Sequence, residues 1–566
     1  MKLAKLKIQD FRGLKGNQNE IDFSNSDIIF LLGQNNVGKS TYLRAYEFFR
    51  TSSQKSAIED FYNQTSENQI IIEGWFIKED GDENEIDLQG KGKEKDPDWV
   101  NKWVGEDGFI KVRKEWKNIG DGFEKFTFSP EQNSWVLNGF GGMESLFTRY
   151  TPEAIVISAM EDQSSLEKKV NDLLEKEFVK KAKDAYPEKY ESLINGVKEL
   201  QSLITGSESV ENLNVELNKH FQQVFTDLTL KIQASKDENI KIEDAFKKNH
   251  SVIVERKENP RKETFLQNGH GVIRQALFNF LTFIKRESET NRKQYLILFE
   301  EPEVFLHPKI AFKLRNSLYE LAANSPYQII CATHSPLMID ISKPHASLIR
   351  VVKSTDEITT TFQVGEDVFG RDDEQKERVQ MINRFNPHIC EAFYADKVIL
   401  VEGDTETIVY RDLLKRYYPN EEIFVLNTGS KNNIPFFQEI LTKFQINHFV
   451  IHDTDTEKRV DGKNNSAWTL NQTIWTKTEE ANKIKPNLAR RYVHITNFET
   501  AHEEQYKKIG NAIDISKDKP LRAYKFATSI DDTNKENIDC FKWLQDIVGK
   551  QEILHDMDYI NKNVSN

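Results

Sequence analysis

Residues 31–41 read Leu-Leu-Gly-Gln-Asn-Asn-Val-Gly-Lys-Ser-Thr, and they continue the apolar run Ile28–Leu32. The segment contains the pattern G-x-x-x-x-G-K-[ST], and a helix-compatible stretch runs on from Ser40 to Phe49. A buried strand, a glycine-rich turn and a helix start together direct backbone N–H groups at a polyphosphate. The sequence therefore predicts a phosphate loop in an α/β domain.

The residues of this loop have distinct expected roles in binding ATP and its Mg²⁺. Gly33 and Gly38 permit the tight turn, and Lys39 reaches the β- and γ-phosphates. The Ser40 hydroxyl is a candidate Mg²⁺ ligand. The full predicted nucleotide-binding set in the loop is Gly33, Asn35, Asn36, Gly38, Lys39, Ser40 and Thr41.

A second apolar run, Tyr295–Phe299, ends in the acids Glu300 and Glu301. A Walker B element requires such a strand, because its carboxylates must emerge beside the phosphates at the carboxyl edge of the sheet. Glu300 would hold Mg²⁺ directly or through water, although many ATPases have Asp at this position, and Glu301 would polarise the attacking water. Taken alone, the same residues could form an ordinary strand and a polar turn.

Two further segments fit a nucleotide-binding head. Gln328–Ala332 is predicted to be another buried strand, and it is followed by His334, where a histidine that senses the γ-phosphate is expected. Upstream, residues 268–275 open a helix that contains Gly269, Gly271 and Arg274, an anion-binding start suited to a second nucleotide across a dimer interface.

In this order, the four elements resemble the ABC-type ATPases of the RecF and SMC kind, and the opening residues 5–14 resemble the first strand and turn of those proteins. The resemblance implies that two heads enclose two ATP molecules. Gly269, Gly271 and Arg274 would then act on the nucleotide of the partner head, although this segment departs from the usual Ser-Gly-Gly signature.

The 566 residues predict two or three domains. We expect an ATPase domain at 1–365, a polar linker at 366–390 and a second domain at 391–566. Apolar stripes with helical spacing at 165–250, such as the one at residues 193–204, predict a helical insertion. A compact dimerisation subdomain and ordinary core helices both fit this pattern.

Composition and charge limit the expected location and partners of the protein. The net charge of −13 argues against a generally basic nucleic-acid coat, and the three widely spaced cysteines form neither a disulfide framework nor a zinc pattern. No stretch approaches 18 apolar residues. We therefore expect a cytoplasmic protein with no membrane partner.

The second domain begins with another strand that ends in acids. Lys397–Val401 leads into Glu402, and Glu406 lies one helical turn later. The strand His448–His452 leads into Asp453 and Asp455, whose alternate positions allow both to face the crevice beyond a parallel sheet. Hard oxygen ligands of this kind suit Mg²⁺ or Mn²⁺.

Glu-Gly after one strand and Asp-x-Asp after a later one resemble a Toprim domain. An ABC-type head followed by a carboxy-terminal Toprim domain resembles the OLD (overcoming lysogenisation defect) nucleases over nearly the whole chain. The resemblance implies two metal ions in the Toprim site, a dimer or higher oligomer, and a place in bacterial anti-phage defence, with a helicase, reverse transcriptase or other partner as an open question. The metal ligands that it implies are Glu402, Glu406, Asp453, Asp455 and Glu499, and the catalytic lysine is Lys519 or Lys525.

Three functions follow from these features. The leading one is an ATP-regulated, metal-dependent DNA endonuclease. The alternatives are an ATPase sensor or DNA clamp with an inactive Toprim scaffold, and a topoisomerase or primase. A topoisomerase needs a nucleophilic tyrosine in a separate domain, for which the chain has no room. Whether ATP activates or inhibits cleavage is left open by the sequence.

Overall fold

In the computed structural model, the described residues are 1–79, 100–140, 144–159, 185–204, 294–323, 325–354, 356–365, 387–459, 461–509 and 518–564, together with 164–166, 168, 169, 253–255, 262–264, 377 and 381. The chain divides into two compact units, one of residues 1–159 and 292–566 and the other of residues 160–291. The strands that end in the predicted ATPase acids and those that end in the predicted Toprim acids all lie in the first unit.

The phosphate-loop segment belongs to a six-stranded sheet in which all neighbours are parallel except the edge strand β14. In spatial order its strands are β14 (Thr359–Gln363), β13 (Leu348–Lys353), β3 (Ile28–Leu32), β12 (Tyr327–Ala332), β11 (Tyr295–Glu300) and β8 (Glu153–Ile157). All side chains of β3 and β12 are buried, as expected for mainly apolar strands in a covered parallel sheet, and the amide side chain among them, Gln328, bonds to the backbone of Leu3. β12 therefore separates the phosphate-loop strand from the strand that ends in Glu300.

An antiparallel sheet packs on the same core. Its strands, in spatial order, are β2 (Asn19–Asp22), β1 (Lys2–Gln9), β4 (Ile70–Ile77), β5 (Phe109–Trp116), β6 (Glu124–Ser129) and β7 (Ser134–Leu137). Buried and half-buried residues alternate along β4 and β5, so one face joins the core that also contains residues of β3 and of helix α1 (Lys39–Arg50).

The carboxy-terminal part contains a four-stranded, all-parallel sheet. Its strands, in spatial order, are β16 (Ile423–Asn427), β15 (Lys397–Val401), β17 (Asn447–Asp453) and β18 (Ala489–His494). β15 and β17 are neighbours, so their carboxyl ends lie side by side. This order brings together acids that are about fifty residues apart in the sequence.

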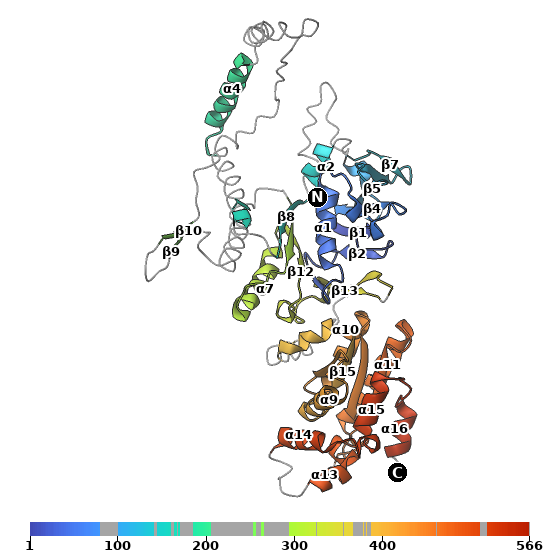
Figure 1. Cartoon of the computed structure of the whole chain (residues 1–566). Coiled ribbons are helices and arrows are strands. Elements are labelled where there is room, and N and C mark those ends of the chain that lie inside the picture. The colour runs from blue at the N-terminus through green and yellow to red at the C-terminus, as the bar shows by residue number, and fades with distance from the viewer. Residues whose placement is uncertain are drawn as a thin grey trace, which may run out of the picture. The chain divides into compact units, whose positions relative to one another are not determined.

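Further helices pack around these sheets (Figure 1), and those from α12 onward follow the last strand, β18. They are α2 (Glu144–Tyr150), α7 (Pro308–Ala322), α9 (Asp404–Tyr417), α10 (Ile434–Lys443), α11 (Ser466–Ile484), α12 (Phe498–Ala501), α13 (Glu503–Ile509), α14 (Lys519–Ser529), α15 (Asp539–Val548) and α16 (Met557–Val564). Within the parts of the chain that are described, no helix is long and apolar enough to cross a bilayer.

The second unit contains helix α4 (Pro187–Ile204) and the short strands β9 (Ile253–Glu255) and β10 (Lys262–Thr264). The apolar stripe at 193–204 does lie on a helix. Most of the predicted insertion at 165–250 lies outside the described residues, and its proposed role in dimerisation stays a prediction.

The end of the predicted linker is ordered. Residues Pro387–Tyr394 form the 3-10 helix η8, in which Ile389 and Cys390 are buried. Sequence reasoning treated 366–390 as polar linker because the charged stretch before it dominates the pattern, and the apolar residues of η8 were too few to indicate a helix.

Candidate active sites

The phosphate loop has the backbone that its glycines predict. Gly33 and Gly38 have φ angles of 148° and 101°, and Asn36 has a φ of 63°. A Cβ atom on Gly33 would lie 2.3 Å from the carbonyl oxygen of Val351 on the neighbouring strand β13. A side chain at Gly33 is therefore excluded by both conformation and space.

Lys39 is buried inside this loop. Its Nζ donates to the carbonyl oxygens of Gly33 (2.8 Å) and Gln34 (2.7 Å) and lies 3.2 Å from Nδ1 of His334. Burial lowers the pKa of Lys39 to about 8, although the nearby carboxylates of Glu301 and Glu303 act in the opposite direction. The lysine, the loop carbonyls and the histidine thus form one contact group.

The acids after β11 reach the same place. The Ser40 hydroxyl donates a hydrogen bond to Oε1 of Glu300, and Oε1 of Glu301 lies 3.5 Å from Nε2 of His334. Burial, together with the Lys39 ammonium, lowers the pKa of His334, so a neutral imidazole is favoured. Because β12 lies between β3 and β11, His334 at its end can contact both Lys39 and Glu301.

Glu303 supports this arrangement and was not singled out from the sequence. Its Oε1 accepts hydrogen bonds from the Thr333 hydroxyl (2.7 Å) and from the backbone N–H of His334 (3.2 Å). Burial raises the pKa of Glu303. Its place three residues after Glu300 was the available signal, but only the fold shows that it holds the turn that carries the histidine.

Some of the other predicted nucleotide-binding residues lie in the phosphate loop, and the rest are outside the described residues. Asn35 and Asn36 are exposed at the tip of the loop, and the N–H of Thr41 donates to the Gly38 carbonyl at the helix start. The remaining three, Gly269, Gly271 and Arg274, lie outside the described residues.

In the carboxy-terminal sheet, Glu402 and Asp453 are in contact. Oε1 of Glu402 accepts a hydrogen bond of 2.8 Å from the backbone N–H of Asp453, across the adjacent ends of β15 and β17. Glu406, in the first turn of α9, is only 5% exposed. Glu499 lies on the short helix α12, just beyond the end of β18.

Burial and mutual repulsion disfavour the ionised forms of these acids. The pKa of Glu402 is raised to about 8, first by burial and then by Asp453. The pKa of Glu406 is raised to about 7 by burial, Asp453 and Glu499, and that of Asp453 to about 7 by burial, Glu499 and Asp455. Several close carboxyl groups without enough cation nearby have this effect.

One carboxylate oxygen of Asp453 has no hydrogen-bond partner. Oδ1 of Asp453 is buried without a hydrogen-bond partner, and the nearest ring nitrogen, Nδ1 of the buried His494, is 3.4 Å away. An orphaned carboxylate oxygen among further carboxylates is a donor set that a hard divalent cation fits.

Asp455 is turned toward a lysine. Its Oδ2 accepts a hydrogen bond of 2.7 Å from Nζ of Lys431, which also donates to the backbone oxygen of Asp453. Among the described residues, no group of three or more His, Cys, Asp or Glu side chains is gathered closely enough to hold a metal ion as it stands. Glu402 and Asp453 are in contact, whereas the Asp455 carboxylate is paired with Lys431.

Sequence reasoning missed Lys431 and favoured other lysines. The available signal was the turn Thr428–Lys431 directly after β16, an element placed at the correct edge of the sheet. The predicted catalytic lysines, Lys519 and Lys525, are exposed on α14, which packs against α9. In the described part of the chain neither contacts the acids, so their role stays a prediction.

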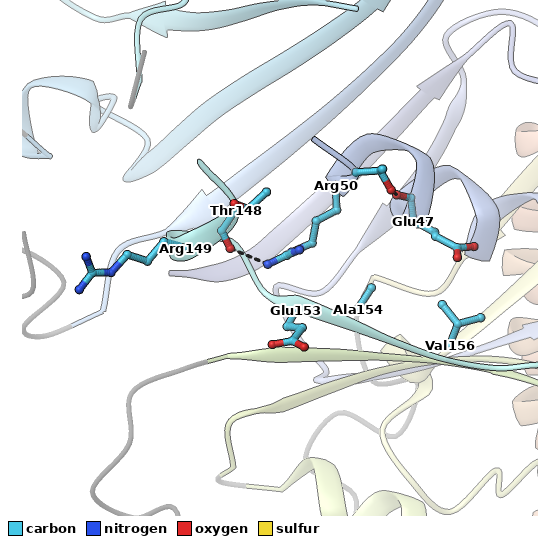
Figure 2. Close-up of a pocket in the computed structure, with 8 residues that line it drawn as sticks. Glu47, Arg50, Thr148, Arg149, Glu153, Ala154 and Val156 are labelled. Atoms are coloured by element: carbon cyan, nitrogen blue, oxygen red, sulfur yellow. Dashed lines mark hydrogen bonds between the residues drawn. The ribbon is translucent and has the colours of Figure 1, made fainter. Parts of the chain in front are cut away.

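A pocket of about 550 Å³ is lined by residues of neither acidic site, and Figure 2 shows its lining. It is located at the carboxyl end of α1, whereas the phosphate loop lies at the amino end of the helix. Arg50 donates to the carbonyl oxygen of Thr148, and Arg149 points away from the other labelled side chains (Figure 2). None of the predicted site residues lines this pocket, whose lining residues are Glu47, Arg50, Thr51, Thr148, Arg149, Glu153, Ala154 and Val156.

Comparison with known proteins agrees with this two-site architecture. Residues 1–132 and 149–339 match the family model of an AAA ATPase domain, and residues 393–455 match the Toprim domain of overcoming-lysogenization-defect-like proteins. The chain belongs to the AAA ATPase domain family over more than half of its length, and it carries an OLD-like Toprim domain. Its ABC-type head with a carboxy-terminal Toprim domain confirms the predicted fold class.

Three relatives give the extent of the similarity. The chain is 26% identical to the Old nuclease of Escherichia phage P2 over 486 residues, which cover 80% of this chain and 77% of that protein. It is 30% identical to the OLD nuclease of Thermus scotoductus over 28% of this chain and 30% of that protein. It is 26% identical to the endonuclease GajA of Bacillus cereus strain HuB5-5 over 38% of this chain and 35% of that protein.

An ATPase domain and a Toprim domain imply, in general terms, that ATP and a divalent metal ion are the cofactors of this family. The chain has residues that suit both ATP and a divalent metal ion. The phosphate loop has the turn and the lysine for ATP, and the Toprim acids have an unpartnered carboxylate oxygen for a metal.

Proposed function

We propose that the protein is a divalent-metal-dependent DNA endonuclease whose cleavage activity is regulated by ATP. The observation that carries the proposal is the cluster at the ends of β15 and β17, where Glu402 contacts Asp453 and Oδ1 of Asp453 has no hydrogen-bond partner. The relatives described above, two nucleases and an endonuclease, support the same reaction class.

The metal ligands would be Glu402, Glu406, Asp453, Asp455 and Glu499, all oxygen donors that suit Mg²⁺ or Mn²⁺. Two bound ions would stabilise the attacking and leaving oxygens of a displacement at phosphorus. The chain's own contribution is to hold carboxylates at the carboxyl edge of a parallel sheet, where neighbouring strand ends face the same crevice. At the other site, Ser40 and Glu300 would hold the ion that accompanies ATP, and Glu301 would orient the attacking water.

A buried arginine supports the regulatory part of the proposal. Arg350, on β13, pairs in register with Leu32, the residue just before the phosphate loop. Its guanidinium, 6% exposed, donates to the carbonyl oxygens of Phe444 (3.2 Å) and Ala395 (3.1 Å) and to Oδ1 of Asp396 (3.0 Å).

Those acceptors lie at the starts of the two Toprim strands that carry the acids. Ala395 and Asp396 immediately precede β15, and Phe444 lies shortly before β17. One side chain therefore connects the strand beside the phosphate loop to both strands that end in the Toprim acids. This connection offers a physical route by which nucleotide binding could affect cleavage.

The proposal also includes a homodimer or higher oligomer that acts in anti-phage defence, as the family resemblance implies. Size-exclusion chromatography with light scattering, with and without ATP, measures the assembly. Phage plating on cells that express the wild type or Asp453→Ala tests the defence role, and equal plating efficiencies would contradict it.

A cleavage assay tests the central claim. Supercoiled plasmid is incubated with the purified full-length protein and Mg²⁺ or Mn²⁺, with and without ATP. We expect nicked or linear product from the wild type and at least a hundredfold less from Asp453→Ala, with ATP hydrolysis unchanged. If the wild type cuts neither plasmid nor linear DNA under any metal and ATP condition, the ATPase sensor or clamp replaces the endonuclease.

A further inference from the structure

Lys431 is a buried cation at the centre of the Toprim acid cluster. It begins the 3-10 turn η9 (Lys431–Asn433) and is 4% exposed. Its ammonium donates to the backbone oxygen of Asp453 and to Oδ2 of Asp455, so it contacts both residues of the Asp-x-Asp pair. A lysine is almost never buried to this extent unless its charge is paired.

The sheet order explains how this lysine reaches the acids. β16 adjoins β15, and the turn after β16 carries Lys431 past the end of β15 to the end of β17. The Thr428 hydroxyl donates to the carbonyl oxygen of Val401 (2.9 Å), and the Asn433 side chain donates to the carbonyl oxygen of Thr428 (2.8 Å). These bonds fix the turn against β15 and set the position of the ammonium.

Asp455 has an uncommon backbone conformation, and its side chain pairs with the lysine. Asp455 has a φ of 57°, and its backbone N–H donates to the Thr496 carbonyl (2.9 Å) beyond β18. Its carboxylate, 34% exposed, could turn toward solvent, yet it pairs with the 5% exposed Lys431 side chain. The ion pair therefore selects where the Asp455 carboxylate lies.

We propose that Lys431 is the internal counter-ion of the Toprim site and that divalent-metal binding transfers the Asp455 carboxylate from the Lys431 ammonium to the metal. This inference rests on the metal site of the proposed function and assigns a regulator of its affinity. Lys431 is a positioning residue in this scheme: it stabilises the site while the metal is absent, and it opposes the arrival of a second cation.

The consequence for metal affinity follows from charge. The ammonium and a divalent ion would share the same carboxylate within a few ångströms, and like charges at such distances in a poorly solvated site repel strongly. Removal of the Lys431 charge frees Asp455 and abolishes this repulsion. The metal should then bind more tightly, which is the opposite of what the loss of a metal ligand or of a merely structural residue would cause.

The test is a Mn²⁺ titration by isothermal calorimetry on the full-length protein without DNA or nucleotide, at pH 8. We expect Lys431→Met to bind Mn²⁺ roughly tenfold or more tightly than the wild type. Lys431→Arg, which keeps the charge, should stay within about threefold of the wild type. The matched control is Lys477→Met, since Lys477 also pairs with acids (Glu439 and Glu480) but lies on α11 away from the site. Equal or weaker Mn²⁺ binding by folded Lys431→Met would overturn the proposal.

A measurement on the unaltered protein covers the case in which Lys431→Met does not fold. Acetic anhydride labelling, read by mass spectrometry, should modify Lys431 several-fold faster with Mg²⁺ than with EDTA, because the ammonium loses its carboxylate partner. Unchanged labelling of Lys431, with Lys477 as the internal reference, would refute the transfer. Both readouts measure metal binding and not cleavage, so a wild type that binds Mn²⁺ but cuts no DNA would defeat the proposed function and leave this inference intact.

Discussion

Replacement of Glu402 by Gln should stabilise the metal-free protein at high pH. Burial and the neighbouring Asp453 raise the pKa of Glu402 to about 8 in the folded state, against an ordinary value of 4.5. Between these two values the folded chain keeps a proton that the unfolded chain releases. The contribution of Glu402 to stability is therefore fully present below pH 4.5 and is lost as the pH rises through 8.

The size of the effect follows from the same pKa. A carboxyl group whose pKa rises from 4.5 to about 8 destabilises the fold by roughly 3–5 kcal/mol when it is forced to ionise. Glutamine has a similar shape and no charge to desolvate. At pH 8.5 in EDTA, Glu402→Gln should therefore raise the melting temperature of the Toprim domain by roughly 6–15 °C, and at pH 4.5 by almost nothing.

Scanning calorimetry in EDTA from pH 4.5 to 8.5 measures this difference. Glu504→Gln, at an exposed position on α13, is the matched control and should follow the wild type at every pH. Addition of Mg²⁺ at pH 8.5 should stabilise the wild type far more than Glu402→Gln, because the substitution removes a ligand. If Glu402→Gln melts with the wild type across the whole range in EDTA, the acids are not a repelling cluster and the reasoning fails.

The remaining predictions concern the ATPase domain and its link to the Toprim domain. Lys39→Ala should abolish ATP binding and leave Mn²⁺ binding by the Toprim domain unchanged; an unaltered ATP affinity in calorimetry would remove the nucleotide assignment. Glu301→Gln should still bind ATP but hydrolyse it roughly 10²–10⁴-fold more slowly in a phosphate-release assay, the range for loss of a general base; near-normal turnover would point to Glu300 instead. Arg350→Met should uncouple the two domains, so that plasmid cleavage no longer responds to ATP while hydrolysis continues; an ATP response equal to that of the wild type would exclude this route.

The strands could be predicted from sequence because each is a short run of apolar residues that ends at a polar turn. Ile28–Leu32 and Lys397–Val401 have the same bounds in the structure as in the sequence prediction. The start of α7 depends on local capping: the helix begins at Pro308, because proline suits the first helical turn and the His307 side chain caps it. Pattern therefore identified the elements, and local capping decided their ends.

The supporting side chains could not be predicted, because they depend on strand order. Glu303 acts on His334 only because β12 lies beside β11, and Lys431 reaches Asp455 only because β16 adjoins β15. The hydrophobic pattern of a single segment does not show which strands will be neighbours in the sheet. Residues named from motifs lie at strand ends by definition, whereas residues that hold those ends come from neighbouring strands.

The position of Arg350 limits what the nucleotide can change in the Toprim site. The arginine binds the starts of β15 and β17, and the acids lie at the opposite ends of these strands, more than 15 Å away for a five-residue strand at about 3.3 Å per residue. The backbone ladder between the two strands fixes their register from Lys397 to Val401. A shift of Arg350 would therefore move β15 and β17 together and preserve the spacing between Glu402 and Asp453. By this argument ATP should alter the access of DNA to the acids, or their orientation toward it, and should leave the metal affinity of the isolated cluster unchanged.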